Sequence, residues 1–408
     1  MIWEKGEAEA AAEQFDLRRL PAKFYIDPYP VYRALRERAP VKRLPDGSLF
    51  LSAYDDLLAV YKDTGAFSSD KREEFRPKYG DSPLYEHHTT SLVFNDPPLH
   101  TRVRKLIAGA LTPRAIGDLA PDLDSLVSDL LEDMEGREEV DLIEDFAAKI
   151  PIEVIGNLLA VPHGDRWPLR GWSLAILGAL EPAPAKAVLE AGDRAVIEMS
   201  AYLDGLIAER RRRPGDPARD VLTRLLAGED GERLSASELI HNCIFLLNAG
   251  HETTTNLIGN ASAALWAWQG ERRRLIETPE LIAQAIEEFL RFESSNQLGN
   301  RRAAREAEIG GVKVAAGQLV TLGIGAANRD PKAFRDPERL DVARSPNRHL
   351  AFAAGPHQCA GLALARLEGR VAIGQFLRRY PDYGLAGEPT LGGRARFRGF
   401  LRLPARLR

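Results

Sequence analysis

The feature that most constrains this fold is one long segment without a helix-breaking residue. It starts at Ser235 and continues beyond Trp268 with no proline. Ser235 and Glu238 have the spacing of a capping box, in which each side chain satisfies a backbone N–H group of the other residue. About 30 helical residues at roughly 1.5 Å each span about 45 Å. We therefore expect a fold organised around one helix that crosses the whole domain.

The remaining chain also has mainly helical periodicity. The segments 119–134, 188–210 and 279–292 carry apolar residues three and four positions apart, which is typical of amphipathic helices. Strand-like stretches are short and occur at 48–51 and 308–322. These patterns predict a mainly α fold with small β-sheets.

Composition excludes several classes of protein. The chain has 408 residues, is 44% hydrophobic and carries a formal net charge of −4, which removes the bulk electrostatic case for nucleic-acid binding. No segment reaches the roughly 20 apolar residues of a membrane helix, and the N-terminus lacks a signal-peptide pattern. We expect a cytoplasmic protein with no membrane or nucleic-acid partner. No linker divides the sequence, so we expect a single domain over 1–408, with about 1–25 as an N-terminal extension.

Only two cysteines are present, which excludes a disulfide framework and a four-thiolate metal site. Cys243 lies among apolar residues of the long helix and indicates a core position. Cys359 lies in a Gly/Ala-rich loop, 352–361, that leads into a predicted helix. Free N–H groups at a helix start stabilise a thiolate, and small neighbours admit a flat ligand. A buried core cysteine and a nucleophile paired with His357 are the alternatives, although neighbours two positions apart rarely pair well.

This loop resembles the heme-binding signature of the cytochrome P450 family, Phe-Gly-x-Gly-x-His/Arg-x-Cys-x-Gly. The matching residues are Phe352, Gly355, His357, Cys359 and Gly361, and Ala353 replaces the first glycine. The resemblance implies the cytochrome P450 fold, a single domain whose long central helix crosses the heme. It also implies that Cys359 is the axial thiolate ligand of the iron in heme b (iron protoporphyrin IX).

A second match lies in the middle of the long helix. The run Ala249-Gly250-His-Glu252-Thr253-Thr resembles the oxygen-activation motif of the family. Glycine in a helix costs about 1 kcal/mol relative to alanine, and threonine draws hydrogen bonds from the helical ladder. The resemblance implies a groove beside the heme at Ala249 and Gly250, with Glu252 relaying protons and Thr253 assisting cleavage of O₂. On the residues alone, an exposed helix face is the alternative.

Glu288-Phe-Leu-Arg291 matches the Glu-x-x-Arg motif of the same family. A spacing of three residues puts both charges on one helical face, so a surface ion pair is the alternative interpretation. The resemblance implies a buried pair that locks onto a later loop, with Arg339 as the third partner, and that braces the cysteine loop.

Four basic residues occupy positions that contact the heme propionates in the family. His100 and Arg104 are one helical turn apart, and Arg301 and His357 follow in the family order. Charge-assisted hydrogen bonds to carboxylates suit all four side chains. The resemblance implies further heme contacts at Ala249, Gly250, Phe352 and Gly361.

The implied activity is hydroxylation, or a related oxidation, of a small to medium organic substrate with O₂. Because no reductase module follows the heme region, we expect electrons from separate partners. The resemblance to the soluble bacterial class of the family implies a ferredoxin-type donor and its NAD(P)H-dependent reductase, and we expect a monomer. Arg366 and Arg370 form a candidate docking face, with a solvated helix face as the alternative. An H₂O₂-driven peroxygenase and a non-catalytic recruitment domain of the same fold are the other function classes. The Glu252–Thr253 pair argues against the first class, and Cys359 argues against the second.

Candidate substrate contacts come from the variable parts of the family. They are Asn248, Gln297, Leu298 and Phe400. Asn248 is polar where an apolar residue is commoner in the family, and Gln297 is also polar. These polar positions favour an apolar substrate skeleton that bears a hydroxyl or carboxylate. The alternative is that these polar groups bond to backbone or water.

Overall fold

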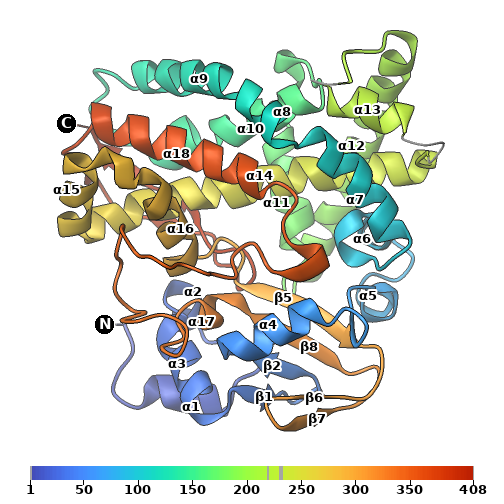
Figure 1. Ribbon diagram of the computed structural model, residues 1–408, viewed down its shortest axis with the longest axis vertical. Helices are drawn as coiled ribbons and strands as arrows, with labels where there is room; N and C mark the ends of the chain where they lie inside the picture. The colour runs from blue at the N-terminus through green and yellow to red at the C-terminus, as the bar shows by residue number, and fades with distance from the viewer. Residues whose placement is uncertain (1, 218–219, 229–232, 408) are drawn as a thin grey trace.

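The structure is a computed structural model that describes residues 2–217, 220–228 and 233–407. A large helical layer lies above a smaller layer that holds the main sheet and the N-terminal helices (Figure 1). Helix α14 (Ala236–Ala267) crosses the helical layer and is 32 residues long. The predicted capping box is present: Ser235 Oγ accepts the Glu238 N–H at 3.1 Å, and Glu238 Oε2 accepts the Ser235 N–H at 2.8 Å.

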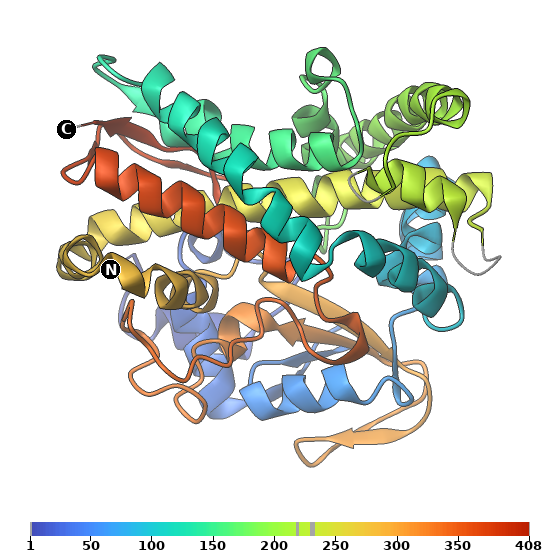
Figure 2. The same ribbon diagram turned by 45° about the horizontal axis from the view of Figure 1, so that its top comes forward.

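Four helices surround α14 and bury most of its surface. They are α10 (Lys149–Leu158), α11 (Leu169–Gly178), α12 (Lys186–Arg212) and α18 (Leu362–Arg379). Figure 2 shows α18 running beside α14. Because the helix that follows the cysteine loop packs directly on the central helix, Cys359 and the middle of α14 are held close together.

The lower layer contains a five-stranded sheet in the order β1-β2-β8-β5-β3. Its strands are β1 (Val41–Arg43), β2 (Leu49–Leu51), β3 (Phe67–Ser68), β5 (Leu298–Ala303) and β8 (Leu319–Gly323). β2 and β8 are parallel, and the other neighbours are antiparallel. Two helices that pack on each other lie beside this sheet, α1 (Glu7–Glu13) and α3 (Tyr29–Arg38).

The N-terminal stretch takes part in this layer. Trp3, Ala8, Ala12 and Phe15 are buried in one apolar cluster with Phe50 of β2. Residues 1–25, which we expected to be an extension, therefore supply part of a core.

The other elements complete the two layers. The other helices of the described chain are α2 (Ala22–Ile26), α4 (Tyr54–Lys62), α5 (Arg72–Tyr79), α6 (Pro83–Thr90), α7 (Leu99–Ala110), α8 (Pro113–Asp118), α9 (Ala120–Asp133), α13 (Val221–Ala227), α15 (Gln269–Glu277), α16 (Ile282–Phe292) and α17 (Ile324–Ala327), with single turns at η1 (Leu92–Phe94), η3 (His163–Asp165), η4 (Pro279–Leu281) and η5 (Gly355–His357) and a π-helix at η2 (Leu142–Ala147). Small strands form a β4-β12-β9 sheet and the pairs β6-β7 and β10-β11: β4 (Val140–Asp141), β6 (Ala307–Ile309), β7 (Val312–Val314), β9 (Gly384–Leu385), β10 (Thr390–Leu391), β11 (Phe400–Arg402) and β12 (Pro404–Arg406).

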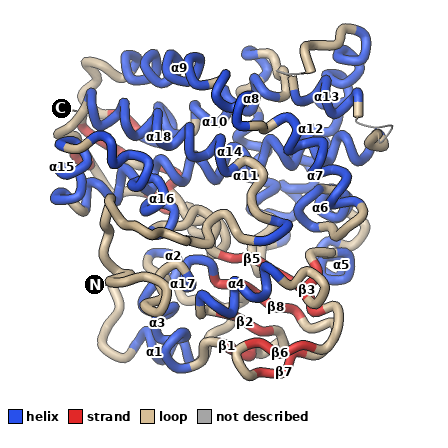
Figure 3. Tube along the Cα trace, viewed as in Figure 1, coloured by secondary structure: helices blue, strands red, loops and turns tan. Residues whose placement is uncertain are grey.

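The mainly α fold with small sheets is confirmed, and Figure 3 shows helices dominating the chain. The three segments with helical periodicity form α9, α12 and the η4–α16 pair. Among the helices of the described ranges, none is both long and apolar enough to cross a membrane.

Candidate active site

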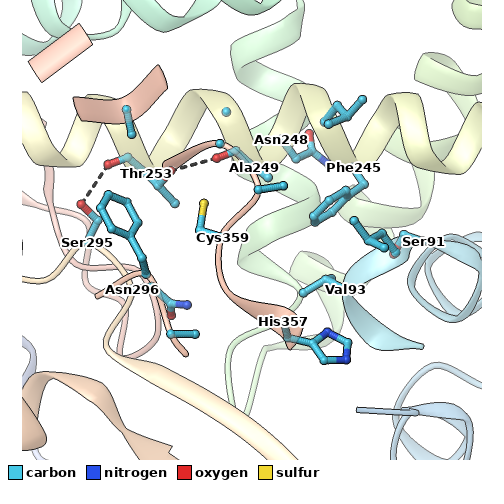
Figure 4. A pocket seen from close by; sticks show the side chains of 18 of the residues that line it. Ser91, Val93, Phe245, Asn248, Ala249, Thr253, Ser295, Asn296, His357 and Cys359 are labelled. Atoms are coloured by element: carbon cyan, nitrogen blue, oxygen red, sulfur yellow. Dashed lines mark hydrogen bonds between the residues drawn. The ribbon is translucent and has the colours of Figure 1, made fainter. Parts of the chain in front are cut away.

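Cys359 lies between the turn η5 and the start of α18, on one wall of a large cavity. Its backbone N–H donates to the carbonyl of Phe352 at 2.9 Å, which fixes the loop. Figure 4 shows the sulfur facing the segment of α14 that carries Ala249 and Thr253. Burial raises the pKa of the Cys359 thiol, while the Gly361 N–H and the positive charge of Arg104 favour the thiolate.

The other cysteine has a different setting. Cys243 is fully buried in the main core, and burial raises the pKa of its thiol to about 12. Since Cys243 is absent from the cavity wall, it is the core residue that the sequence predicts.

The cysteine loop depends on two unusual backbone conformations. Gly355 has φ +70°, and a Cβ atom there would lie 2.4 Å from the carbonyl oxygen of Tyr61 in α4. The glycine is therefore required both for its conformation and for its contact with α4. Ala353, which replaces the first glycine of the signature, also adopts a left-handed conformation with φ +56°, at a cost of about 1 kcal/mol.

Basic side chains gather at one edge of the cavity. The rings of His100 and His357 lie 3.9 Å apart, and Arg104 and Arg301 line the same cavity. Burial and the charges of Arg301, His100 and Arg104 lower the pKa of His357 to about 3. Within the described chain, the buried His100 Nε2 and Arg301 Nε atoms have no hydrogen-bond partner. This edge therefore suits a ligand with carboxylate groups, and the residues fit a heme that Cys359 and these basic side chains would hold.

A turn of α14 whose carbonyls accept hydrogen bonds from side chains borders the cavity opposite Cys359. Thr253 Oγ1 donates to the carbonyl of Ala249 at 2.8 Å, and Ser295 Oγ donates to the carbonyl of Thr253 at 2.8 Å (Figure 4). Ala249, Gly250 and Thr253 all line the cavity. This part of the motif is a cavity wall and not an exposed helix face.

Glu252 lies on the flank of α14 and is not among the residues that line the cavity. Its carboxylate accepts a hydrogen bond from Asn256 at 3.3 Å and lies 3.5 Å from the guanidinium of Arg394. Burial raises the pKa of Glu252, and Arg394 opposes that shift. Consecutive residues of a helix point about 100° apart, so Glu252 and Thr253 do not face the cavity together.

Glu288 and Arg291 of α16 form a fully buried bidentate pair. Arg291 Nε and one of its terminal nitrogens each lie 2.7 Å from a Glu288 oxygen, and both side chains are 0% exposed. Arg291 also donates to the carbonyls of Asn328 and Pro337. The alternative interpretation as a surface pair is excluded by this burial.

The expectation that Arg339 completes this network with its side chain is wrong. The Arg339 side chain is 66% exposed, and only its carbonyl accepts a hydrogen bond from Arg291. The third side chain is Arg344, whose Nε donates to both Glu288 oxygens at 3.1 and 3.0 Å. The loop turns between positions 336 and 344, which brings the later arginine back to the pair. We call Glu288, Arg291 and Arg344 the brace.

The two arginines of α18 differ in their contacts. Arg366 donates to both oxygens of Glu287 at 2.7 Å, and its guanidinium lies 5.1 Å from the centre of the Phe352 ring. Arg370 is exposed. Arg366 is thus tied to α16 beside the cysteine loop, whereas Arg370 is available at the surface.

Two of the four expected substrate contacts line the cavity, Asn248 and Leu298. Gln297 is wrong as a substrate contact: successive residues of an extended chain point to opposite sides, and its amide is buried against the Ser294 carbonyl. Phe400 packs against the core and does not line the cavity.

The sequence missed several residues of the cavity wall. They are Asn296, Arg396 and Phe397. A single bridge between Asn296 and Phe397 brings two distant segments together at the wall. Asn296 and Phe397 lie close in sequence to the expected contacts Gln297 and Phe400, and this proximity could have indicated them. Which of these side chains faces the cavity depends on irregular strands.

Comparisons with known proteins agree with this geometry. A family model described as Cytochrome P450 matches residues 274–381. The chain is 40% identical to Cytochrome P450 107B1 of Saccharopolyspora erythraea, covering 96% of this chain and 98% of that protein. It is 39% identical to Vitamin D(3) 25-hydroxylase of Pseudonocardia autotrophica, covering 92% and 91%. A solved structure of P450BioI in complex with a hexadec-9Z-enoic acid ligated Acyl Carrier Protein superposes with a TM-score of 0.90 at 34% identity, over 95% of this chain and 99% of that chain. The chain belongs to the cytochrome P450 family of heme b-dependent monooxygenases, enzymes that oxidise organic substrates with O₂ and electrons from redox partners.

Proposed function

We propose that this monooxygenase holds its heme through Cys359 and oxidises an apolar organic molecule bound beneath α14. The supporting observation is that the Cys359 sulfur and the turn of α14 at Thr253 line one cavity from opposite sides. The overall reaction is R–H + O₂ + 2 e⁻ + 2 H⁺ → R–OH + H₂O. The residues must therefore hold the cofactor, exclude water from the substrate and deliver two protons.

His100, Arg104, Arg301 and His357 would bind the heme propionates, since all four line one edge of the cavity. His100 Nε2 and Arg301 Nε have no hydrogen-bond partner within the described chain. Ala249, Gly250, Phe352 and Gly361 would contact the ring, because small or flat side chains admit a planar ligand. The bound heme supplies the iron that activates O₂, and a thiolate ligand favours cleavage of the O–O bond. We propose one heme-binding domain over 1–408, because both layers contribute to the cavity wall.

Thr253 and Glu252 would share the delivery of protons. The Thr253 hydroxyl lies at the cavity wall, where it can hold a proton or a water molecule beside bound O₂. Glu252 is buried, and its raised pKa suits a group that accepts a proton. Its contact with Arg394 places the carboxylate on the outer side of α14. In this proposal the Glu252 carboxylate accepts a proton on the outer side of α14, and the Thr253 hydroxyl delivers a proton to the cavity.

Replacing Thr253 tests this division of roles. We expect Thr253→Ala to consume reducing equivalents at a similar rate but to release more H₂O₂ and less oxidised product. Thr253→Ser keeps the hydroxyl and serves as the matched control. The measurement is H₂O₂ formed per NADPH consumed, with a surrogate ferredoxin, its reductase and cyclododecanone as the substrate probe. Equal H₂O₂ yields from the alanine and serine variants would contradict the role of Thr253.

The same preparation tests the cofactor assignment. We expect the reduced protein with CO to give the red-shifted Soret band of a thiolate-ligated heme, and Cys359→Ser to abolish it. H₂O₂-driven turnover without a ferredoxin, at the full rate of the reconstituted system, would favour the peroxygenase alternative. A protein that binds no heme would favour the recruitment domain.

We further propose a ferredoxin-type donor with an NAD(P)H-dependent reductase, and a monomer that works in the cytoplasm. The exposed Arg370 on the helix that follows Cys359 supports docking of an acidic donor near the thiolate. Two unpaired cysteines are typical of a reducing compartment. Light scattering checks the monomer, and Arg370→Glu should slow reduction by the ferredoxin and make it less salt-dependent.

A further inference from the structure

Asn248 is a buried amide with one half of its hydrogen-bonding capacity unused. It lies on α14, four residues before Glu252, and its side chain is part of the cavity wall. The residue is 2% exposed, and its Nδ2 atom has no partner in the described protein. A buried donor without an acceptor is unfavourable, so this position needs an explanation beyond packing.

A neighbouring helix fixes the orientation of this amide. The hydroxyl of Ser173 in α11 donates to Asn248 Oδ1 at 2.8 Å, and Ser173 is itself 1% exposed. Because the carbonyl end is engaged by α11, the amino end is directed elsewhere. Figure 4 shows the Asn248 side chain beside Phe245, on the stretch of α14 that borders the cavity.

The two helices packed beside this part of α14 contribute only apolar side chains to the cavity wall. The cavity residues that α10 and α11 contribute are Ile155, Leu158, Ile176 and Leu177. None of these side chains can accept a hydrogen bond. We therefore infer that a bound ligand supplies the hydrogen-bond acceptor for Asn248 Nδ2.

We propose that Asn248 is a specificity-determining residue that selects apolar substrates bearing one neutral oxygen acceptor, such as a ketone, lactone or hydroxyl oxygen. A neutral acceptor fits better than a carboxylate, because an ionised group is costly to bury beside aliphatic side chains. Ser173 is the positioning residue that orients the amide. This inference rests on the proposed function, since it assigns the substrate class of the same cavity.

The position of Asn248 also predicts where such a substrate is oxidised. Asn248 and Thr253 are five residues apart on α14, which corresponds to about 7.5 Å along the helix axis. An acceptor bound at Asn248 would hold the oxidised carbon several bonds away from that oxygen. Products should therefore carry the new hydroxyl at a remote carbon and not beside the existing oxygen.

The test compares two probes of nearly the same shape, cyclododecanone and cyclododecane. Dissociation constants come from optical titration of the heme-loaded chain, with the ligand-induced rise in melting temperature as a second readout. The quantity of interest is the preference for the ketone over the hydrocarbon. We expect this preference to fall about tenfold in Asn248→Leu, while cyclododecane binds within threefold of the parent protein.

Two further variants separate a specific contact from a general disturbance. Ser173→Ala leaves the amide in place but removes its orientation, so we expect a loss of ketone preference of at least threefold. Ser262→Ala removes a buried hydroxyl that bonds to the Ile258 carbonyl on the same helix, away from the cavity, and should leave the preference unchanged.

An unchanged ketone preference in Asn248→Leu, with the thiolate-type CO spectrum intact, would overturn the inference and leave the proposed function standing. Loss of preference in all three variants would also overturn it, because the effect would then not belong to the amide. Absence of the CO spectrum from the parent protein would overturn the proposed function together with this inference.

Discussion

The brace behind the cysteine loop and the opposite wall of the cavity differ in how completely their buried polar groups are satisfied. On the Cys359 side, the Glu288 carboxylate of the brace accepts hydrogen bonds from Arg291, Arg344, Asn347 and the Asp341 N–H. On the opposite side, buried nitrogen atoms of Asn248, His87 and His88 have no partner in the described chain. We call this second side the distal wall, formed by α14 with α6 and α11.

This difference separates two tasks. A closed network such as the brace specifies one arrangement of its loops without help from a ligand. An unsatisfied buried donor or acceptor costs about 1–3 kcal/mol, so the distal wall is most stable when a bound molecule supplies hydrogen-bond partners. The brace fixes the chain between Asn328 and Asn347, and we expect it to support the cysteine loop that follows. In our proposal the distal wall leaves the choice of substrate to a few polar atoms.

The largest expected effect comes from opening the brace. Arg291→Leu leaves Glu288 buried with one guanidinium partner fewer, and we expect a loss of about 3–5 kcal/mol of stability. Urea unfolding of the heme-loaded protein and the heme-to-protein absorbance ratio check this expectation. Arg339→Ala is the matched control, because its exposed side chain lies outside the pair, and it should change stability by less than about 0.5 kcal/mol. Equal losses of stability in the two variants would mean that the Arg339 side chain does belong to the brace.

A second prediction tests an exception on the Cys359 side. Glu368 of α18 is 2% exposed and lines the cavity, and its Oε2 atom has no partner in the described chain. Burial raises the pKa of Glu368 to about 8. The unfolded chain has a value near 4.3. Between these values the folded state holds a proton that the unfolded state has lost, so stability falls as the pH rises.

Glu368→Gln removes this titration. Between pH 5 and pH 7 the parent protein should lose roughly 2–3 kcal/mol of unfolding free energy that the variant keeps, at up to about 1.4 kcal/mol per pH unit. Urea midpoints at the two pH values measure this difference. Glu280→Gln replaces an exposed carboxyl and provides the control. If both variants gained stability relative to the parent protein by the same amount as the pH rises, Glu368 would not be the group responsible.

The smallest expected effect concerns the backbone of the cysteine loop. Ala353→Gly relieves a left-handed alanine, and we expect a gain of about 1 kcal/mol or less, since the added freedom of the unfolded chain offsets part of the relief. Gly355→Ala makes the opposite change at a site where a Cβ meets Tyr61 and should destabilise the protein. Thermal melting of both variants measures the contrast. A loss of stability in Ala353→Gly would mean that its methyl group contributes packing that outweighs the strain.

Local patterns predicted the features that depend on short stretches of sequence. The capping box at Ser235, the long helix and the position of Cys359 before α18 all follow from neighbouring residues. The exclusion of Cys243 from the chemistry also follows from its apolar context. Each of these depends on helical periodicity or on a contiguous motif. Both can be recognised in the sequence without knowledge of the tertiary fold.

The errors arose where irregular segments meet. Arg344, and not Arg339, reaches Glu288 because several turns intervene between them. Asn296 and Phe397 line the cavity in place of Gln297 and Phe400 because one bridge sets their orientation. Ser173 could not be linked to Asn248 from sequence, since 75 residues separate them. The rotation between Glu252 and Thr253 was predictable from helix geometry alone.

The close contact between Gly355 and the backbone of Tyr61 links the cysteine loop to the lower layer, which affects how the two layers are stabilised. The thiolate loop rests on the lower layer, the facing wall is α14 of the upper layer, and Arg301 enters from β5. A prosthetic group placed there acts as a shared core between two layers. Loading and folding then become one linked equilibrium, in which free heme at 100 times its dissociation constant adds about 2.7 kcal/mol to the stability of the native state. The supply of heme during synthesis would thus act as a limit on how much native protein accumulates.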